Sequence, residues 1–277
     1  MSYARLMVHL ELGKSNAALL TVAGDLAERS HASLVGIAAA QPLVATPYAG
    51  AFISGEAIEL DRAEIEREAK VAQSEFQTIL SGRVADLEWR CMETTALLSD
   101  YLASEARSVD VIVTAPDRGG GLLPDTRRTS VGDLVMRAGR PVIIVPTHAT
   151  GLKPERALVA WKDCREARRA ALDALPLLEI SGHVTVVEVA RKEDEAAARR
   201  RLTDVADWLK RHGILAEILV SPATGDDVAA LSTLARAERA DVIVAGAYGH
   251  SRLREWTFGG MTADLLLNPA CCVLLSR

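Results

Sequence analysis

Residues 241–260 read DVIVAGAYGHSRLREWTFGG, and this stretch decides the fold of the chain. Residues 241–245 form a short, β-branched apolar run that is typical of a buried strand. The chain leaves this strand at Gly246 and enters a predicted helix near Gly259, whose free amide groups point back toward the loop. Glycines at these positions and at Gly249 let backbone N–H groups approach a phosphate closely. The stretch therefore predicts an anion-binding loop.

An internal duplication runs through the chain. A shift of 131 residues places the DVIV of residues 110–113 over the DVIV of residues 241–244, and Val142 over Val273 without a gap. Self-similarity at a fixed period indicates two copies of one structural unit.

Each half has the pattern of five strands alternating with amphipathic helices. This order predicts an α/β fold with two tandem doubly wound five-stranded parallel-type sheets and helices on both faces. The expected domains are residues 1–149 and 153–277. Strands are expected at residues 5–10, 34–39, 85–91, 110–114 and 142–145 in the first half, and at residues 157–161, 184–189, 215–220, 241–245 and 272–275 in the second.

The glycine spacing of the loop resembles the Gly-x2-Gly-x9-Gly-Ser/Thr phosphate loop of the universal stress protein family. Gly246, Gly249 and Gly259 match the three glycines, and Gly260 stands where the family has a hydroxyl residue. The chain looks like a tandem universal stress protein with an adenine nucleotide alpha hydrolase-like fold. Its loop motif is present in the second half.

The resemblance implies a cytoplasmic stress-response protein that binds an adenine nucleotide. The implied ligand is ATP, with or without Mg²⁺, and the implied action is nucleotide-dependent association rather than efficient catalysis. In the family the phosphates rest on the loop, an Asp at the end of the first strand holds the adenine, and a backbone group after the second strand contacts it.

The adenine side of the site departs from the family pattern. Lys162 stands in place of the Asp, and an ammonium group only donates hydrogen bonds. Asp163 is the nearest carboxylate, and Val189 matches the backbone contact. The predicted nucleotide-binding residues are Gly246, Gly249, His250, Ser251, Gly259, Gly260, Val189 and Asp163.

Two interpretations stay open for the polar residues after Gly249. Ser251 is a phosphate hydrogen-bond donor with His250 as its charge partner, or both belong to a solvated polar turn. In the first half Glu11 occupies the acidic position, but Ala115, Arg118 and Arg128 stand where the loop glycines would be. The first half is therefore read as a degenerate copy.

A second hypothesis treats the chain as a scaffold or dimerisation protein that binds no nucleotide, with both sites degenerate. Lys162 and Gly260 favour it. We expect no enzyme, apart from slow ATP hydrolysis, because the chain has no nucleophile elbow, no Walker lysine and no His-rich metal motif.

Composition bounds the partners. The net charge is −5, with Arg and Glu interspersed, so we expect no nucleic-acid binding. No run of about eighteen apolar residues and no apolar leader is present, which predicts a cytoplasmic protein without membrane contact. Three of the four cysteines, Cys91, Cys271 and Cys272, lie in or beside predicted strands and are expected to be buried.

The last strand of each half is expected at a sheet edge. Apolar edges at residues 142–145 and 272–275 invite pairing. In the family these strands pair across a dimer, so the resemblance implies a pseudo-dimer within one chain. It leaves open a further homodimer of whole chains.

Overall fold

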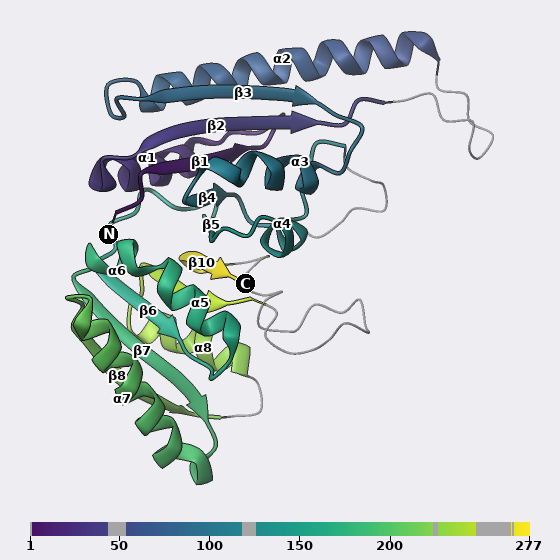
Figure 1. Cartoon of the computed structure of the whole chain (residues 1–277). Helices are drawn as coiled ribbons and strands as arrows, with labels where there is room; N and C mark the ends of the chain where they lie inside the picture. The colour runs from purple at the N-terminus through teal and green to yellow at the C-terminus, as the bar shows by residue number, and fades with distance from the viewer. Residues whose placement is uncertain (1, 44–53, 118–125, 224–226, 248–266, 268) are drawn as a thin grey trace.

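The computed structural model describes residues 2–43, 54–117, 126–223, 227–247, 267 and 269–277. Ten strands form one sheet with the order β3-β2-β1-β4-β5-β10-β9-β6-β7-β8, and helices cover it on both faces (Figure 1). In each half the first strand pairs with the second and the fourth, so the strand order reverses between the first and fourth strands.

The described residues of the first half form five strands and four α-helices. These are β1 (Arg5–Leu10), α1 (Ala17–Ser30), β2 (Ser33–Ala40), α2 (Gly55–Leu80), β3 (Leu87–Glu93), α3 (Leu98–Glu105), β4 (Val111–Thr114), α4 (Val131–Arg137) and β5 (Val142–Ile144).

The second half repeats this order among the described residues. Its elements are β6 (Arg156–Ala160), α5 (Arg165–Asp173), α6 (Leu175–Glu179), β7 (His183–Ala190), α7 (Glu195–Arg211), β8 (Ala216–Pro222), α8 (Asp227–Ala237), β9 (Val242–Gly246) and β10 (Cys272–Ser276). All ten predicted strands are present, with small shifts at their ends. The predicted α/β fold class is therefore confirmed.

The two predicted sheets are halves of one continuous sheet. Strand β5 pairs antiparallel with β10, with Ile143 opposite Leu274, while the other neighbouring strands of the sheet are parallel. Each of these two strands is an apolar edge of its own half, so their pairing removes two edges at once. All residues paired across this seam are at most 1% exposed. Burial of such a side chain stabilises by about 1.5–3 kcal/mol, so the seam is part of the core.

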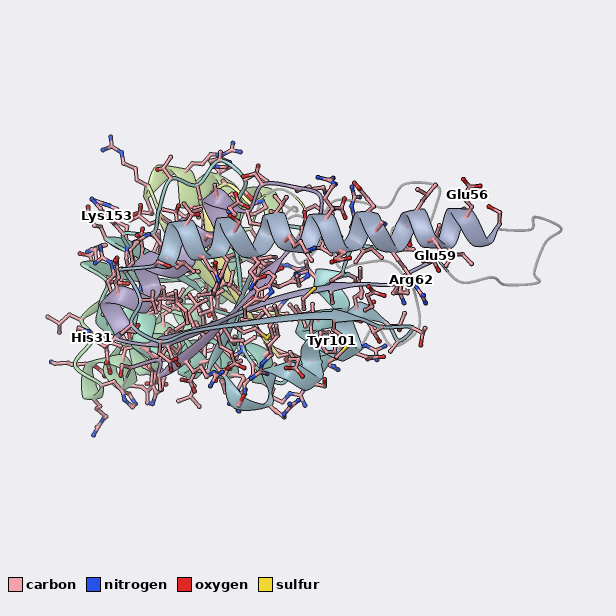
Figure 2. The ribbon with its side chains drawn as sticks, turned by 90° about the horizontal axis from the view of Figure 1, so that it is seen from above. His31, Glu56, Glu59, Arg62, Tyr101 and Lys153 are labelled. Carbon is pink, nitrogen blue, oxygen red and sulfur yellow. The ribbon has the colours of Figure 1, made fainter. Side chains whose placement is uncertain are left out.

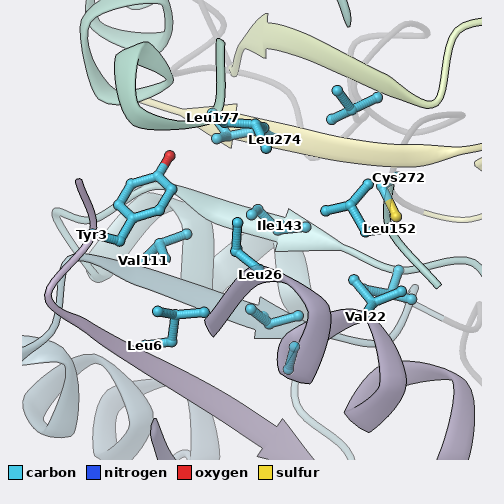
Figure 3. Packing of buried hydrophobic residues seen from close by; sticks show 14 of the residues in the cluster. Tyr3, Leu6, Val22, Leu26, Val111, Ile143, Leu152, Leu177, Cys272 and Leu274 are labelled. Carbon is cyan, nitrogen blue, oxygen red and sulfur yellow. The ribbon is translucent and has the colours of Figure 1, made fainter. Parts of the chain in front are cut away.

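Two hydrophobic clusters fill the layers above and below the sheet, and both include residues of the two halves. One lies under α1, α2, α5, α6 and α7, and the other under α3, α4 and α8. Figure 3 shows the first cluster at the seam, where Leu26 of α1 lies near Ile143, with Leu274 beyond it on the same side. This arrangement is the doubly wound layering that the sequence predicts.

The connection between the halves is held by side-chain contacts. Asp25 of α1 accepts the backbone N–H of Leu152 at 2.7 Å, and Arg83 donates to the same carboxylate at 2.6 Å. The Tyr3 hydroxyl donates to the backbone oxygen of Asp173 in α5 at 3.0 Å. The bond to Asp25 joins the segment after β5 to the first half. The bond from Tyr3 joins the start of the chain to the second half.

The cysteine prediction is wrong for Cys91, which is exposed on the edge strand β3. The edge strand has only one neighbour, so a residue there is covered less than its apolar pattern indicates. Cys272 is buried, and Cys271 is half-buried. Burial raises the pKa of each of these two thiols to about 12, which keeps both protonated at neutral pH.

Across the described ranges no helix has the length and apolar character needed to cross a membrane.

Candidate functional site

Three of the predicted site residues fall in the described part of the chain. They are Gly246, Val189 and Asp163, while Gly249, His250, Ser251, Gly259 and Gly260 lie outside the described residues. The three described residues lie at the edge of the sheet from which the predicted loop departs.

The carboxyl ends of β6, β7 and β9 lie at one edge of the sheet. Ala160 stands in register with Val187 of β7 on one side and with Ala245 of β9 on the other. Gly246 and Val189 therefore flank the position just after β6 from opposite sides. In an open α/β sheet, ligands collect at such an edge where the strand order reverses.

Trp161 fills the position between these two flanks. Its backbone N–H donates to the Val187 oxygen at 2.7 Å, and its half-buried ring packs against the first hydrophobic cluster. The indole Nε1 is buried and has no hydrogen-bond partner within the described portion of the chain. A buried donor without an acceptor costs about 1–3 kcal/mol, and the Trp161 Nε1 is a donor that the described residues leave unsatisfied. Sequence reasoning treated Trp161 only as the end of a strand.

Gly246 lies in direct contact with the first turn of α5. A Cβ at this position would sit 2.5 Å from the Ala167 nitrogen and 2.5 Å from the Glu166 carbonyl carbon. Real Cβ atoms do not approach backbone this closely, so only glycine fits there. Packing alone therefore explains the first glycine of the motif.

Glu166 brings a fixed negative charge to the same place. Its side chain is 10% exposed, and Arg165 donates to its Oε1 from Nη2 at 2.9 Å. Burial raises the pKa of Glu166, but hydrogen bonds from its own backbone N–H and from Arg165 hold it below its usual range. The carboxylate stays ionised and occupies the amino end of α5, where an anion would otherwise be favoured.

Lys162 and Asp163 lie on the surface directly after β6, with Trp161 between them and the strand. Asp163 accepts a hydrogen bond from Arg168 of α5 at 3.0 Å, and both side chains of this pair are more than half exposed. A role for Asp163 in holding a base requires its carboxylate to leave Arg168. Such exposed pairs are worth about 0–1 kcal/mol, so this exchange is cheap.

Val189 lies in β7, in register with Ser221 of β8, and is half-buried. Val189 is thus inside the strand, one residue before β7 ends at Ala190.

The corresponding edge of the first half is filled by the chain itself. Asn16 accepts from the Glu11 backbone N–H at 2.9 Å and donates to the Glu11 oxygen at 3.0 Å, and Lys14 pairs with the Glu11 carboxylate at 3.3 Å. The N–H of Gln41, directly after β2, donates to the Thr126 oxygen at 2.7 Å. The backbone donor after the second strand is thus already used.

A buried histidine lies at this edge, and sequence reasoning passed over it. The Nδ1 of His9 lies 3.0 Å from the Thr114 hydroxyl, and its Nε2 lies 3.5 Å from the Thr129 hydroxyl. Burial lowers the pKa of His9 to about 4, so the ring is neutral at pH 7. His9 joins β1, β4 and the start of α4 as a structural residue.

The part of the chain that is described contains no group of three or more His, Cys, Asp or Glu side chains that could hold a metal ion. A cavity of about 290 Å³ lies at the amino ends of β7 and β8, where His183 and Glu217 contribute to its lining. Because this is the opposite edge of a parallel sheet, the cavity is separate from the candidate site.

Comparison with solved structures places the fold. A universal stress protein from Archaeoglobus fulgidus DSM 4304 aligns with a TM-score of 0.71 at 13% identity, over 99% of this chain and 98% of that chain. A functionally unknown protein from Pseudomonas aeruginosa PAO1 aligns with a TM-score of 0.63 at 13% identity, over 99% of this chain and 92% of that chain. No protein-family model and no curated protein sequence matches the chain.

These alignments cover both halves of the molecule, and they define the class. The chain has the fold of the universal stress proteins, the adenine nucleotide alpha hydrolase-like fold, carried over its whole length in two halves. At this level of identity the likeness concerns the fold alone.

Proposed function

We propose that this chain is a cytoplasmic stress-response protein of the universal stress protein family that binds an adenine nucleotide in its second half. The ligand is ATP, with or without Mg²⁺. Its phosphates rest on the loop that begins at Gly246, and its base lies beside Trp161 and the backbone of Val189. The two domains correspond to residues 1–149, the degenerate copy, and residues 153–277, which carry the loop.

The observation that carries this proposal is the unpaired Trp161 indole at the sheet edge from which the glycine loop departs. A buried donor at the point where the strand order reverses is suited to an acceptor on a planar base. The same edge of the first half has its Gln41 donor satisfied internally. Of these two donors, only the Trp161 indole lacks a partner among the described residues.

The protein acts by association rather than by efficient catalysis. At the candidate edge, the described carboxylates of Glu166 and Asp163 are each paired with an arginine, Arg165 and Arg168, which leaves both poorly placed as a general base. Nucleotide binding would instead change the surface that the loop presents to a partner.

A second candidate function is a scaffold without a nucleotide. It is favoured by Glu166, which already supplies a negative charge at the amino end of α5, and by the contact that explains Gly246 through packing alone. In this alternative the continuous ten-stranded sheet is itself the functional feature.

Calorimetric titration of ATP and AMP, each with Mg²⁺, separates these functions. The titration uses the wild-type chain, Gly249→Arg, and Leu215→Arg as a matched control. Leu215 is 78% exposed and lies at the amino end of β8, so the control adds the same charge away from the site. We expect saturable binding to the wild type and the control, and none to Gly249→Arg. An absence of heat from the folded wild type at millimolar ATP contradicts nucleotide binding and favours the scaffold.

A further inference from the structure

Helix α2 is far longer than its neighbours and carries three acids on one face. It runs past the carboxyl ends of β2 and β3, and Glu56, Glu59 and Arg62 lie on the projecting part (Figure 2). Asp61, Glu68 and Glu75 follow one another at intervals of seven residues. Two helical turns separate such residues, so the three carboxylates share one face, and we call them the acidic stripe.

Each member of the stripe binds a different connection at the edge of the sheet where the strands of the first half have their carboxyl ends. Asp61 accepts from the Leu43 backbone N–H after β2, at 2.8 Å. Glu75 accepts from the Ser15 hydroxyl at 2.8 Å and the Asn16 backbone N–H at 2.9 Å, in the connection after β1. The helix is thereby fastened to the strand ends along its length.

Arg127 completes the fastening from the connection after β4. Its Nη2 lies 2.9 Å from Asp61 Oδ1, and its Nε lies 2.7 Å from Glu68 Oε2. The side chains of this trio are only 10–20% exposed, unlike those of Arg67 and Glu64 on the outer face of the same helix. If one partner of this shielded network is removed, the other charges are left unpaired. Such a removal therefore costs much more free energy of folding than the loss of a surface pair.

The hydrogen-bond donors that the stripe occupies are those that an anion would use at this edge. They are two backbone N–H groups, a hydroxyl and a guanidinium, and each already binds a carboxylate of α2. We propose that α2 is an internal strap. Its acidic stripe closes the edge of the sheet at which the strands of the first half end, and it excludes anionic ligands from that edge. This inference does not depend on nucleotide binding in the second half.

Hydrogen exchange of single amides tests the closure. Arg127→Met breaks the trio, and Arg67→Met is the matched control because it removes an exposed arginine from the outer face of α2. We expect the Gln41 and Leu43 amides to exchange about tenfold faster or more in Arg127→Met, because both bonds depend on the fastened strap, and at wild-type rates in the control. Unchanged exchange in β9 and β10 shows that the variant is folded. Wild-type exchange at Gln41 and Leu43 in a folded Arg127→Met overturns the strap.

A charge-neutral strap tests the exclusion of anions. The variant Asp61→Asn/Glu68→Gln/Glu75→Gln keeps the shapes and removes three negative charges. It is made in the Gly249→Arg background, so that any binding belongs to the first half. Titration with ATP should give saturable binding that the Gly249→Arg parent lacks. The absence of binding to the folded neutral variant overturns the exclusion, whatever the second half binds.

Discussion

Asp110 and Asp241 make the same contact in the two halves of the molecule. The Asp110 carboxylate accepts the backbone N–H groups of Ala4 at 2.6 Å and Arg5 at 3.0 Å, where β1 begins. The Asp241 carboxylate accepts the N–H of Arg156 at 2.9 Å, where β6 begins. The duplicated DVIV therefore begins with an aspartate because it joins the fourth strand to the start of the first.

Replacement of Asp110 by alanine should destabilise the fold by about 1–3 kcal/mol, because two backbone donors lose a charged acceptor. Asp241→Ala removes one such bond and should cost less. Urea unfolding at pH 7 measures both free energies. No loss in either variant would show that the repeated aspartate is not a structural clasp, and equal losses would contradict only the larger cost expected for Asp110→Ala.

Gly246→Ala should be strongly destabilising without any ligand. The added methyl group would meet the backbone of Glu166 and Ala167 at 2.5 Å, and overpacking of this kind costs about 1–3 kcal/mol. Gly55→Ala is the control, because a Cβ at Gly55 has open space around it. A wild-type melting temperature for Gly246→Ala would contradict the close contact between β9 and α5.

His9 should make stability depend on pH. Its folded pKa of about 4 lies below the ordinary value of 6.5, so between these values the unfolded chain binds more protons than the folded one. Stability from the neutral ring is complete above pH 6.5 and is lost as the pH falls toward 4, by about 3 kcal/mol at most.

The variant His9→Gln should lack this contribution to the pH slope. Unfolding free energies between pH 7 and 4.5 measure the difference from the wild type, with the partly exposed His183→Gln as the control. Parallel pH profiles for the wild type and His9→Gln would refute the assignment.

Glu166→Gln should strengthen ATP binding several-fold if the phosphates approach Gly246. The amide keeps the shape and an acceptor oxygen but removes a negative charge from the binding edge, and one nearby charge at a partly exposed site is worth about 1 kcal/mol. Calorimetric titration compares the two affinities. Weaker or equal binding by the variant would place the phosphates elsewhere.

The sequence predicted the strands well because their signal is local. The β-branched runs at β4 and β9 are short, buried over four consecutive residues and directly preceded by an aspartate, so composition and length identify them without knowledge of the fold. The repeat of 131 residues then related the halves. The apolar strands at residues 142–145 and 272–275 indicated unsatisfied edges, which the antiparallel pairing of β5 with β10 covers.

The candidate site could be predicted only in part, because its chemistry depends on contacts between distant segments. Gly246 was interpreted from its loop motif, whereas its contact with Glu166 arises from packing of α5 on β9. The unpaired indole of Trp161 is a property of burial, which no local pattern reveals. The acidic stripe on α2 was not predicted, because its hydrogen-bond donors come from three separate connections.

The resonance of the Trp161 indole N–H tests the central proposal most directly. A two-dimensional nitrogen–proton spectrum is recorded during titration with ATP and Mg²⁺, and Trp161→Phe assigns the signal. If the nucleotide binds at the edge between β6 and β9, the Trp161 signal shifts and saturates, while that of Trp208 on α7 stays in place. Saturating ATP that leaves the Trp161 signal unmoved contradicts a nucleotide site at this edge.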